Sequence, residues 1–383
     1  MNLHAQACKW MWRLLVAGVA LLMVACADAP VKPQPAALTR NPELLTVRQV
    51  WSSTVGRVTL PLQVGVAGQT VSLGSDDGQV LVLDASTGVE QWRLSGADRL
   101  AAGLSAGVGG DGNLFAAVSA NNELIVWKNG RELWRQQMSA QVFTAPLVAG
   151  ARVFVLTADR VVLAFDGATG RKLWSQTRSA EPLVLRQAGV LLPVGDTLLV
   201  GLSGRLLGLN PGSGSIRWEV PIASPRGVNE IERLVDLVAG VSRQGDEVCV
   251  RAFQSAVGCV NTSRGKLTWG KPAVGAVGLD GDDRLVVGAE GDGKLVAWRR
   301  ADGERAWTSE LLKFRGLTGP LVLGRSVVVG DAAGYLHFLS REDGSLLARV
   351  ATDGSGIAAT PVVAGKTLVV VTRNGGVFAY RPD

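Results

Sequence analysis

The chain has 383 residues, of which 47% are hydrophobic, and a formal net charge of +6. No run of Lys or Arg is longer than two residues, so the concentrated basic patch that nucleic-acid binding requires is missing. The length exceeds that of most single domains, but a repeat protein can grow within one domain.

Residues 1–25 have the pattern of a secretory signal peptide. A short positive region with Lys9 and Arg13 precedes the apolar run LLVAGVALLMVA, which is too short to span a bilayer. Removing residues 1–25 takes away two of the 39 cations and no acid, so the net charge falls from +6 to +4. Residues 26–45 are rich in Pro and poor in large apolar side chains, and they predict an extended tether to a domain at 46–383.

One sequence pattern then recurs along most of the chain. Its first copy, DGQVLVLDASTGVEQWRL, spans residues 77–94 and has a turn glycine four residues before a Trp. The interval between successive turn glycines is close to the period of one four-stranded propeller blade, which is about 40 to 45 residues. These glycines are Gly88, Gly130, Gly170, Gly214, Gly265, Gly303 and Gly344.

Each copy predicts two antiparallel strands joined by a tight turn. The first strand is apolar and β-branched, and the turn has Asp or Asn early and Gly late. The second strand ends in Trp, except in the seventh copy, where Ala348 takes that position. Because a blade cannot bury both faces alone, we expect the Trp rings to wedge between neighbouring blades.

The two ends of the chain complete the ring. After the seventh copy the sequence ATPVVAGKTLVVVTRNGGVFAYRPD supplies three strands of an eighth blade but no Trp strand. Near the start, Trp51 precedes Gly68 by the same interval by which Trp307 precedes Gly324. We therefore expect residues 47–55 to be the outer strand of the last blade. The predicted fold is all-β: an eight-bladed β-propeller of four-stranded antiparallel blades, with no open edge at the join.

Cys249 and Cys259 lie on two strands of one predicted hairpin, whose connection is near Gln254. Counting from the turn places them opposite each other, so a cross-strand disulfide is one interpretation in an oxidising compartment. Two buried, unbridged cysteines are the alternative. They have no His partner and are not adjacent, so neither a metal site nor thiol catalysis is expected.

The sequence does not support catalysis. His337, the single histidine after residue 25, lies on a predicted strand and favours a structural role. The motifs HExxH, GxSxG, CxxCH and the Walker loop do not occur. We predict no catalytic residue, no metal and no cofactor.

Two connections between blades are longer than the others. The interval from the Trp position to the next strand turn is nearly constant in four blades, but it is longer from Trp174 to Gly195 and longest from Trp218 to Gly245. These two connections follow consecutive blades, so we expect them side by side on one face, where extra loop length often carries function. They supply Leu183, Leu185, Arg186, Glu232, Arg233, Leu234 and Asp236. The residues alone allow a plainer interpretation, an inner strand with solvated charges.

The repeats LDASTGVEQW and FDGATGRKLW resemble those of pyrroloquinoline-quinone-type propellers, which include dehydrogenases and non-enzymatic relatives. The dehydrogenases usually carry a vicinal Cys pair and Ca²⁺ ligands, and this chain has no adjacent cysteines. The sequence LMVAC, which ends at Cys26, resembles the lipobox of bacterial lipoproteins, in which the Cys is acylated. Lipobox, tether, eight repeats and length together resemble the BamB family of outer-membrane assembly lipoproteins.

This resemblance implies a non-enzymatic scaffold of the β-barrel assembly machinery, anchored by lipid to the periplasmic face of the outer membrane. In the BamB family, loops with Leu-x-Leu-Arg and Arg-Leu-x-Asp patterns contact a POTRA domain of the barrel protein BamA. The resemblance implies this partner contact for Leu183, Leu185, Arg186, Arg233 and Asp236. The family often has a second acid where this chain has Val238. The alternative functions are a quinone-dependent dehydrogenase and a polysaccharide-binding propeller.

Overall fold

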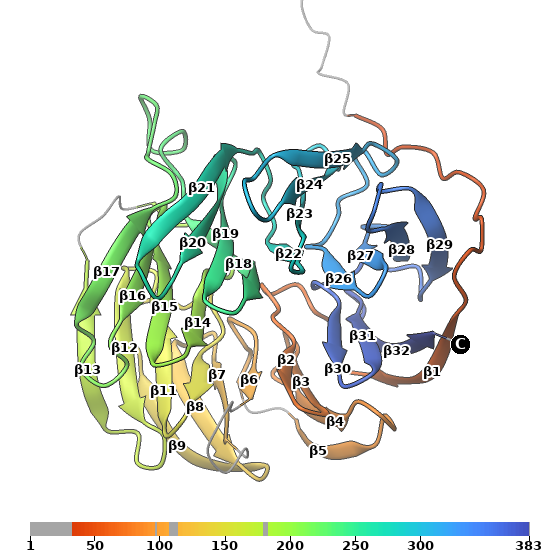
Figure 1. Cartoon of the computed structure of the whole chain (residues 1–383). Coiled ribbons are helices and arrows are strands. Elements are labelled where there is room, and N and C mark those ends of the chain that lie inside the picture. The colour runs from red at the N-terminus through yellow and green to blue at the C-terminus, as the bar shows by residue number, and fades with distance from the viewer. Residues whose placement is uncertain (1–32, 96–97, 107–113, 179–182, 383) are drawn as a thin grey trace, which may run out of the picture. The chain divides into compact units, whose positions relative to one another are not determined.

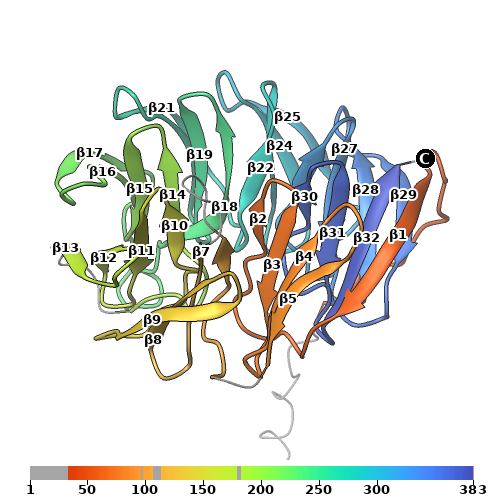
Figure 2. The same cartoon turned by 90° about the horizontal axis from the view of Figure 1, so that it is seen from below.

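The computed structural model describes residues 33–95, 98–106, 114–178 and 183–382. The chain divides into two compact units, Met1–Pro35 and Ala36–Asp383, and every strand of the described residues lies in the second. These strands form eight four-stranded sheets, which are the blades of a propeller (Figures 1 and 2). The predicted signal peptide and Cys26 lie outside the described residues. The described part of the chain contains no apolar helix of membrane-spanning length.

The first four blades follow the chain in order, with the innermost strand first. Blade 1 is β2 Gly65–Ala67, β3 Thr70–Gly74, β4 Val80–Asp84 and β5 Glu90–Leu94. Blade 2 is β6 Ser105–Ala106, β7 Leu114–Val118, β8 Glu123–Lys128 and β9 Arg131–Gln137. Blade 3 is β10 Leu147–Ala149, β11 Arg152–Leu156, β12 Val161–Asp166 and β13 Lys172–Thr177. Blade 4 is β14 Leu191–Val194, β15 Thr197–Leu202, β16 Arg205–Leu209 and β17 Ile216–Pro221.

The remaining blades continue the same order until the last one. Blade 5 is β18 Leu237–Gln244, β19 Glu247–Ala252, β20 Ala256–Asn261 and β21 Lys266–Pro272. Blade 6 is β22 Leu279–Gly281, β23 Leu285–Ala289, β24 Leu295–Arg299 and β25 Arg305–Ser309. Blade 7 is β26 Leu321–Leu323, β27 Ser326–Gly330, β28 Tyr335–Ser340 and β29 Leu346–Ala351. Blade 8 is β30 Val362–Ala364, β31 Thr367–Val371, β32 Gly376–Pro382 and β1 Val47–Thr54.

The core lies between the blades. The second strand of each blade is apolar on both faces because each face packs on a neighbouring blade, and β15 is buried along its whole length. The outer strand is mostly exposed, as in β9, where only Trp134 is half-buried. The buried apolar residues therefore form a series of clusters between adjacent sheets.

The N-terminal strand closes the ring, as predicted. β1 pairs antiparallel with β32, from Val47 opposite Pro382 to Thr54 opposite Gly376. The sheet order β1-β32-β31-β30 makes β1 the outer strand of blade 8. The prediction of eight four-stranded blades closed by residues near Trp51 is confirmed.

The repeated Trp residues pack between blades. The indole N–H of Trp134 donates to the Gly167 carbonyl in the next blade over 2.9 Å, and Trp307 donates to Arg341 over 2.8 Å. Each ring also covers the turn glycine of the next blade: a Cβ on Gly88 would lie 2.7 Å from Trp51. That glycine has φ +74°, a conformation that suits the turn, and its lack of a Cβ leaves room for the Trp ring.

Part of the predicted tether belongs to the propeller unit. The Ala36 amide donates to the Lys313 carbonyl, and the Leu44 amide donates to the Leu347 carbonyl, each over 2.8 Å. Asn41 bonds the backbone of Arg349 through both its amide oxygen and its amide nitrogen. The compact unit thus begins at Ala36, ahead of the boundary expected at residue 46.

Candidate functional site

The two long connections meet at one buried ion pair. Asp236, from the connection between blades 4 and 5, accepts a hydrogen bond from Arg160 over 2.7 Å. Its other carboxylate oxygen accepts from the Leu185 amide over 3.1 Å. Arg160 also donates to the Leu183 carbonyl over 2.9 Å. Asp236 and Arg160 therefore hold the Leu183–Leu185 segment from two sides.

Backbone pairing fixes the rest of the first connection. Gly189 forms an antiparallel bridge with Val238, and the Ala239 amide donates to the Ala188 carbonyl over 2.8 Å. Val238 is 1% exposed, so its side chain lies in the core. An acid at this position would also be buried. The second acid of the family pattern therefore has no equivalent on the surface of this chain.

The segment presents two leucines and one cation. Leu183 and Leu185 are half-buried, whereas Arg186 is exposed. Within the described part of the chain, the Arg186 guanidinium has no acid partner. The arrangement offers apolar area and one positive charge on a backbone that neighbouring elements hold in place.

The second connection carries apolar side chains that the sequence analysis did not select. Val228 is 96% exposed and Ile231 is 77% exposed. Glu232 accepts a hydrogen bond from the Val228 amide over 2.9 Å, and Asn229 caps the Glu232 amide over the same distance. Arg233 is exposed beside them. Two apolar side chains are therefore exposed on a hydrogen-bonded segment of the second connection.

Arg160 was also missed, although the sequence holds a signal for it. Its φ is +64°, a left-handed conformation that costs a non-glycine residue roughly 1 to 2 kcal/mol. The corresponding turn residue in four other blades is glycine: Gly78, Gly293, Gly334 and Gly375. An Arg at a position that is glycine in other repeats therefore indicates that its side chain has a specific role.

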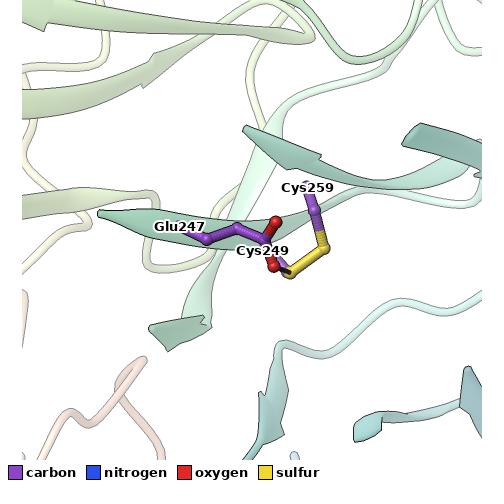
Figure 3. A group of neighbouring side chains, drawn as sticks. All are labelled: Glu247, Cys249 and Cys259. Atoms are coloured by element: carbon purple, nitrogen blue, oxygen red, sulfur yellow. Dashed lines mark hydrogen bonds between the residues drawn. A yellow bond between two sulfur atoms is a disulfide. The ribbon is translucent and has the colours of Figure 1, made fainter. Parts of the chain in front are cut away.

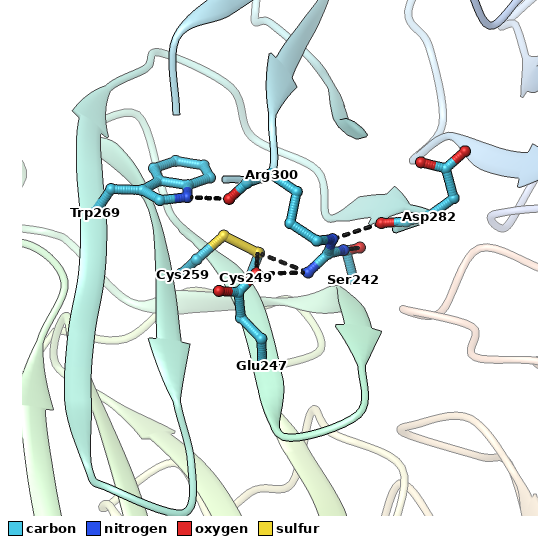
Figure 4. Close-up of a disulfide and its surroundings, with 7 residues drawn as sticks. All are labelled: Ser242, Glu247, Cys249, Cys259, Trp269, Asp282 and Arg300. Atoms are coloured by element: carbon cyan, nitrogen blue, oxygen red, sulfur yellow. Dashed lines mark hydrogen bonds and ion pairs between the residues drawn. A yellow bond between two sulfur atoms is a disulfide. The ribbon is translucent and has the colours of Figure 1, made fainter. Parts of the chain in front are cut away.

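A disulfide joins Cys249 and Cys259, which are directly opposite each other on β19 and β20. Figure 4 shows Arg300 beside it, with its guanidinium between Glu247, Ser242 and the Asp282 carbonyl. The Arg300 carbonyl accepts the indole N–H of Trp269. The bridge and the cation thus lie in the core between blades 5 and 6.

Glu247, Cys249 and Cys259 form the one cluster of possible metal ligands in the described residues (Figure 3). The bridged sulfurs offer no thiolate, which is the form that binds metals. Arg300 lies 3.1 Å from Glu247 and supplies the positive charge there. The arrangement is that of an ion pair beside a disulfide, and it carries no metal chemistry.

Reduction of this disulfide is expected to lower the free energy of unfolding by about 3 kcal/mol, because the bridge restricts the unfolded chain. Urea unfolding with and without reductant measures the effect. A variant with both Cys249→Ala and Cys259→Ala should unfold at one urea concentration under both conditions. An unchanged midpoint for the reduced native sequence would contradict the prediction.

The described residues at the ring centre do not supply the ligands of a Ca²⁺ ion. A pocket of about 420 Å³ lies where connections from several blades converge. Among the described residues that line it, Arg373 is the one charged side chain, and the others are apolar residues, glycines, Gln and Thr. Calcium sites need carboxylate oxygens, which this lining does not supply.

His337 lies elsewhere, in the core of blade 7. It is fully buried, and its Nε2 lies 2.9 Å from Asp331, which also pairs with Arg315. Burial lowers the pKa of the imidazole, so it is neutral at pH 7. His337 thus belongs to a buried hydrogen-bond network and is not part of the surfaces described above.

A family model and individual relatives match the sequence of this chain. The family described as outer membrane protein assembly factor BamB matches residues 76–309. The BamB of Burkholderia pseudomallei is 38% identical over 376 residues, which are 96% of each chain.

Two solved structures share the fold. BamB from Moraxella catarrhalis matches 88% of this chain and 100% of its own, with a TM-score of 0.78 and 23% identity. A quinohemoprotein alcohol dehydrogenase from Comamonas testosteroni matches 90% of this chain and 78% of its own, with a TM-score of 0.66 and 13% identity. At these identities the two structures bear on the fold, whereas the family match and the Burkholderia relative cover the sequence itself. This chain belongs to the outer membrane protein assembly factor BamB family.

Proposed function

We propose that this protein is a non-enzymatic scaffold that binds a POTRA domain of BamA and assists the assembly of outer-membrane β-barrel proteins. The observation that carries the proposal is the junction of the two long connections at Asp236, which presents Leu183, Leu185 and Arg186 together. The names of the relatives, all assembly factors, support this class of function.

The geometry suits a protein contact. Apolar anchors next to an exposed Arg are typical of interface hot spots, where a few residues carry most of the binding energy. The hydrogen bonds from Arg160 and Leu185 to Asp236 hold the segment before a partner arrives, so less conformational entropy is lost on binding. Arg233 lies exposed on the neighbouring connection and adds a second positive charge to the proposed surface.

In this proposal Asp236 positions the contact instead of forming it. Its side chain is 15% exposed, and both carboxylate oxygens are occupied by Arg160 and the Leu185 amide. The sequence analysis gave it the acidic half of the partner contact. The exposed acids of the second connection, Glu230 and Glu232, are better placed for that role.

Anchoring belongs to the same proposal. Acylation of Cys26 would hold the chain at the periplasmic face of the outer membrane, and signal peptidase would remove residues 1–25 once the cysteine is diacylated. Metabolic labelling with a palmitate analogue tests this step. Labelling of the native chain and its loss in Cys26→Ser are the expected results, and labelling of both would contradict the anchor.

Binding to the POTRA domains is tested by calorimetric titration with residues 27–383, which include every described residue. Leu183→Ala, Leu185→Ala and Arg186→Ala combined are expected to weaken binding about 30-fold or more, because they remove the anchors of the hot spot. Unfolding by urea checks that the triple variant keeps its fold.

Arg264→Ala is the matched control, since Arg264 is an exposed cation in the turn between β20 and β21. It should bind as the native sequence does. Equal binding by the triple variant, or no binding by the native chain, would overturn the proposed site.

A further inference from the structure

One of the eight blade interfaces lacks the Trp wedge. Seven interfaces place a Trp ring over the turn glycine of the next blade, whereas blade 7 has Ala348 at that position. At five of the seven interfaces the indole N–H donates to a carbonyl in the turn between the third and fourth strands of the next blade, as Trp307 does to Arg341. Blade 8 has no such turn, because β32 and β1 come from opposite ends of the chain.

A pocket of about 410 Å³ opens at this interface. Its volume is within the range of about 300 to 1,000 Å³ that is typical of ligand sites. Its apolar lining comes from both blades and from the N-terminal strand, with Phe338 directly opposite Ala348. The principal apolar residues are Leu45, Val47, Leu323, Phe338, Val363 and Leu368.

The corresponding space between blades 3 and 4 is different. It measures about 370 Å³, and its lining comes from the first two strands of each blade and from Pro211, whose carbonyl accepts the Trp174 indole N–H. The pocket between blades 7 and 8 continues outward to β28, β32 and β1, which is the region that a Trp ring occupies in the other interfaces.

Tyr380, one of the residues that line this pocket, carries a buried polar group. Tyr380 is 1% exposed, and its hydroxyl has no hydrogen-bond partner among the described residues. Burial raises the pKa of Tyr380 to about 12, so the hydroxyl keeps its proton. An unsatisfied buried hydroxyl costs about 1 to 3 kcal/mol, which a ligand with a polar atom would recover. Arg325, Lys366 and Arg381 are the charged residues of the lining, and all three are cations.

We propose that this pocket binds an aromatic side chain of a polypeptide segment. The seven equivalent positions are each filled by a ring carried on a strand, whereas no aromatic ring on the fourth strand fills this position among the residues that the structure describes. An indole or phenol would fill the apolar part and pair with the Tyr380 hydroxyl. This site lies in blades 7 and 8, so it is separate from the proposed POTRA contact of blades 3 to 5.

The test uses residues 27–383 and two blocked tripeptides, acetyl-Gly-Trp-Gly-amide and acetyl-Gly-Phe-Gly-amide, in calorimetric titrations. The Trp peptide is expected to bind saturably with a Kd below about 1 mM. Leu323→Trp fills the pocket from its own wall and is expected to weaken binding about tenfold or more, because the peptide ring loses its apolar contacts. Ala149→Trp, at the equivalent last position of β10, is the matched control and should bind like the native sequence.

Tyr380→Phe tests the hydroxyl without filling the pocket. The Trp peptide should bind about fivefold more weakly, whereas binding of the Phe peptide, which has no polar ring atom, should stay the same. Equal loss for both peptides would assign Tyr380 a purely packing role and overturn the hydrogen-bond part of the proposal. Binding of free indole but of neither peptide, or equal binding by Leu323→Trp and the native chain, would overturn the polypeptide assignment.

Discussion

Replacing Asp236 with alanine is expected to lower the free energy of unfolding by about 3 kcal/mol and to weaken POTRA binding at the same time. The change removes the Asp236 carboxylate that lies 2.7 Å from the nearly buried Arg160 guanidinium, and removal of one partner from a buried ion pair is strongly destabilising. It also takes away the acceptor of the Leu185 amide, so the Leu183–Leu185 segment loses its support.

Urea unfolding measures the loss of stability, and calorimetric titration measures POTRA binding. Hydrogen exchange of the Leu185 amide reports the loss of its acceptor. Exchange at Leu185 should accelerate beyond what the global loss of stability explains. Asp196→Ala is the control, because Asp196 pairs with Arg217 over 2.8 Å while its side chain is 84% exposed. Its urea midpoint should stay unchanged. Unaltered Leu185 exchange in Asp236→Ala would show that Asp236 does not position the segment.

The change Glu290→Ala is expected to lower the free energy of unfolding by about 4 kcal/mol, because it leaves the charge of Arg251 in the core without its carboxylate partner. Arg251 is fully buried, and its guanidinium lies 3.0 Å from Glu290 and 5.9 Å from the centre of the Trp298 ring. A Cβ on Gly275 or Gly288 would collide with this guanidinium, so both glycines make room for it. Burial lowers the pKa of Arg251, and the charge of Glu290 opposes this shift. Glu290 is the one carboxylate partner of Arg251 among the described residues.

A matched double variant separates charge from packing. Arg251→Met combined with Glu290→Leu removes both charges and keeps apolar volume, and it should recover most of the stability lost in Glu290→Ala. Chemical unfolding of the native chain and the two variants provides the comparison. If Glu290→Ala unfolds at the native urea concentration, the pair contributes nothing to the fold.

The fold could be predicted because its repeating signals are local. A glycine with positive φ, followed four residues later by Trp, marks the third-to-fourth strand turn in six blades, and the Trp ring of one blade covers the turn glycine of the next. The last blade lacks a Trp strand at the C-terminus, and Trp51 has the spacing of such a strand near the N-terminus. Together these observations predicted the strand that closes the ring. Each of these inferences needs only spacing and residue type.

The site was harder to predict because its contacts join segments that share no pattern. The length of two connections indicated where to look, but Arg160 lies in a short turn of blade 3, far along the chain from its partner Asp236. Val238, which stands where the family often has a second acid, is buried and bridges Gly189, and its spacing from Asp236 did not indicate that. Sequence spacing does not reveal which loop residues a tertiary contact buries.

The segment before β1 shows the same limit. Its Pro-rich composition indicates chain without helix or strand, and residues 33–44 form neither, yet those from Ala36 to Leu44 are bonded to blades 6 and 7. These bonds run mainly through backbone groups and through Asn41, none of which forms a hydrophobic pattern. Composition therefore predicts the conformation of such a segment but not the surface on which it lies.

The pairing of β1 with β32 also sets an order of events for the folding chain. Among the described strands, β1 is synthesised first and is the outer strand of the last blade, whereas its partner β32 is synthesised last. Closing so long a loop is slow, because the chain loses conformational entropy before the stabilising contacts between the two strands form. Until β32 is available, the nascent propeller has two open edges, and β1 waits unpaired while seven blades form. A chain that stops before β32 would keep both edges exposed, so the ring closes only when the last strand has been made.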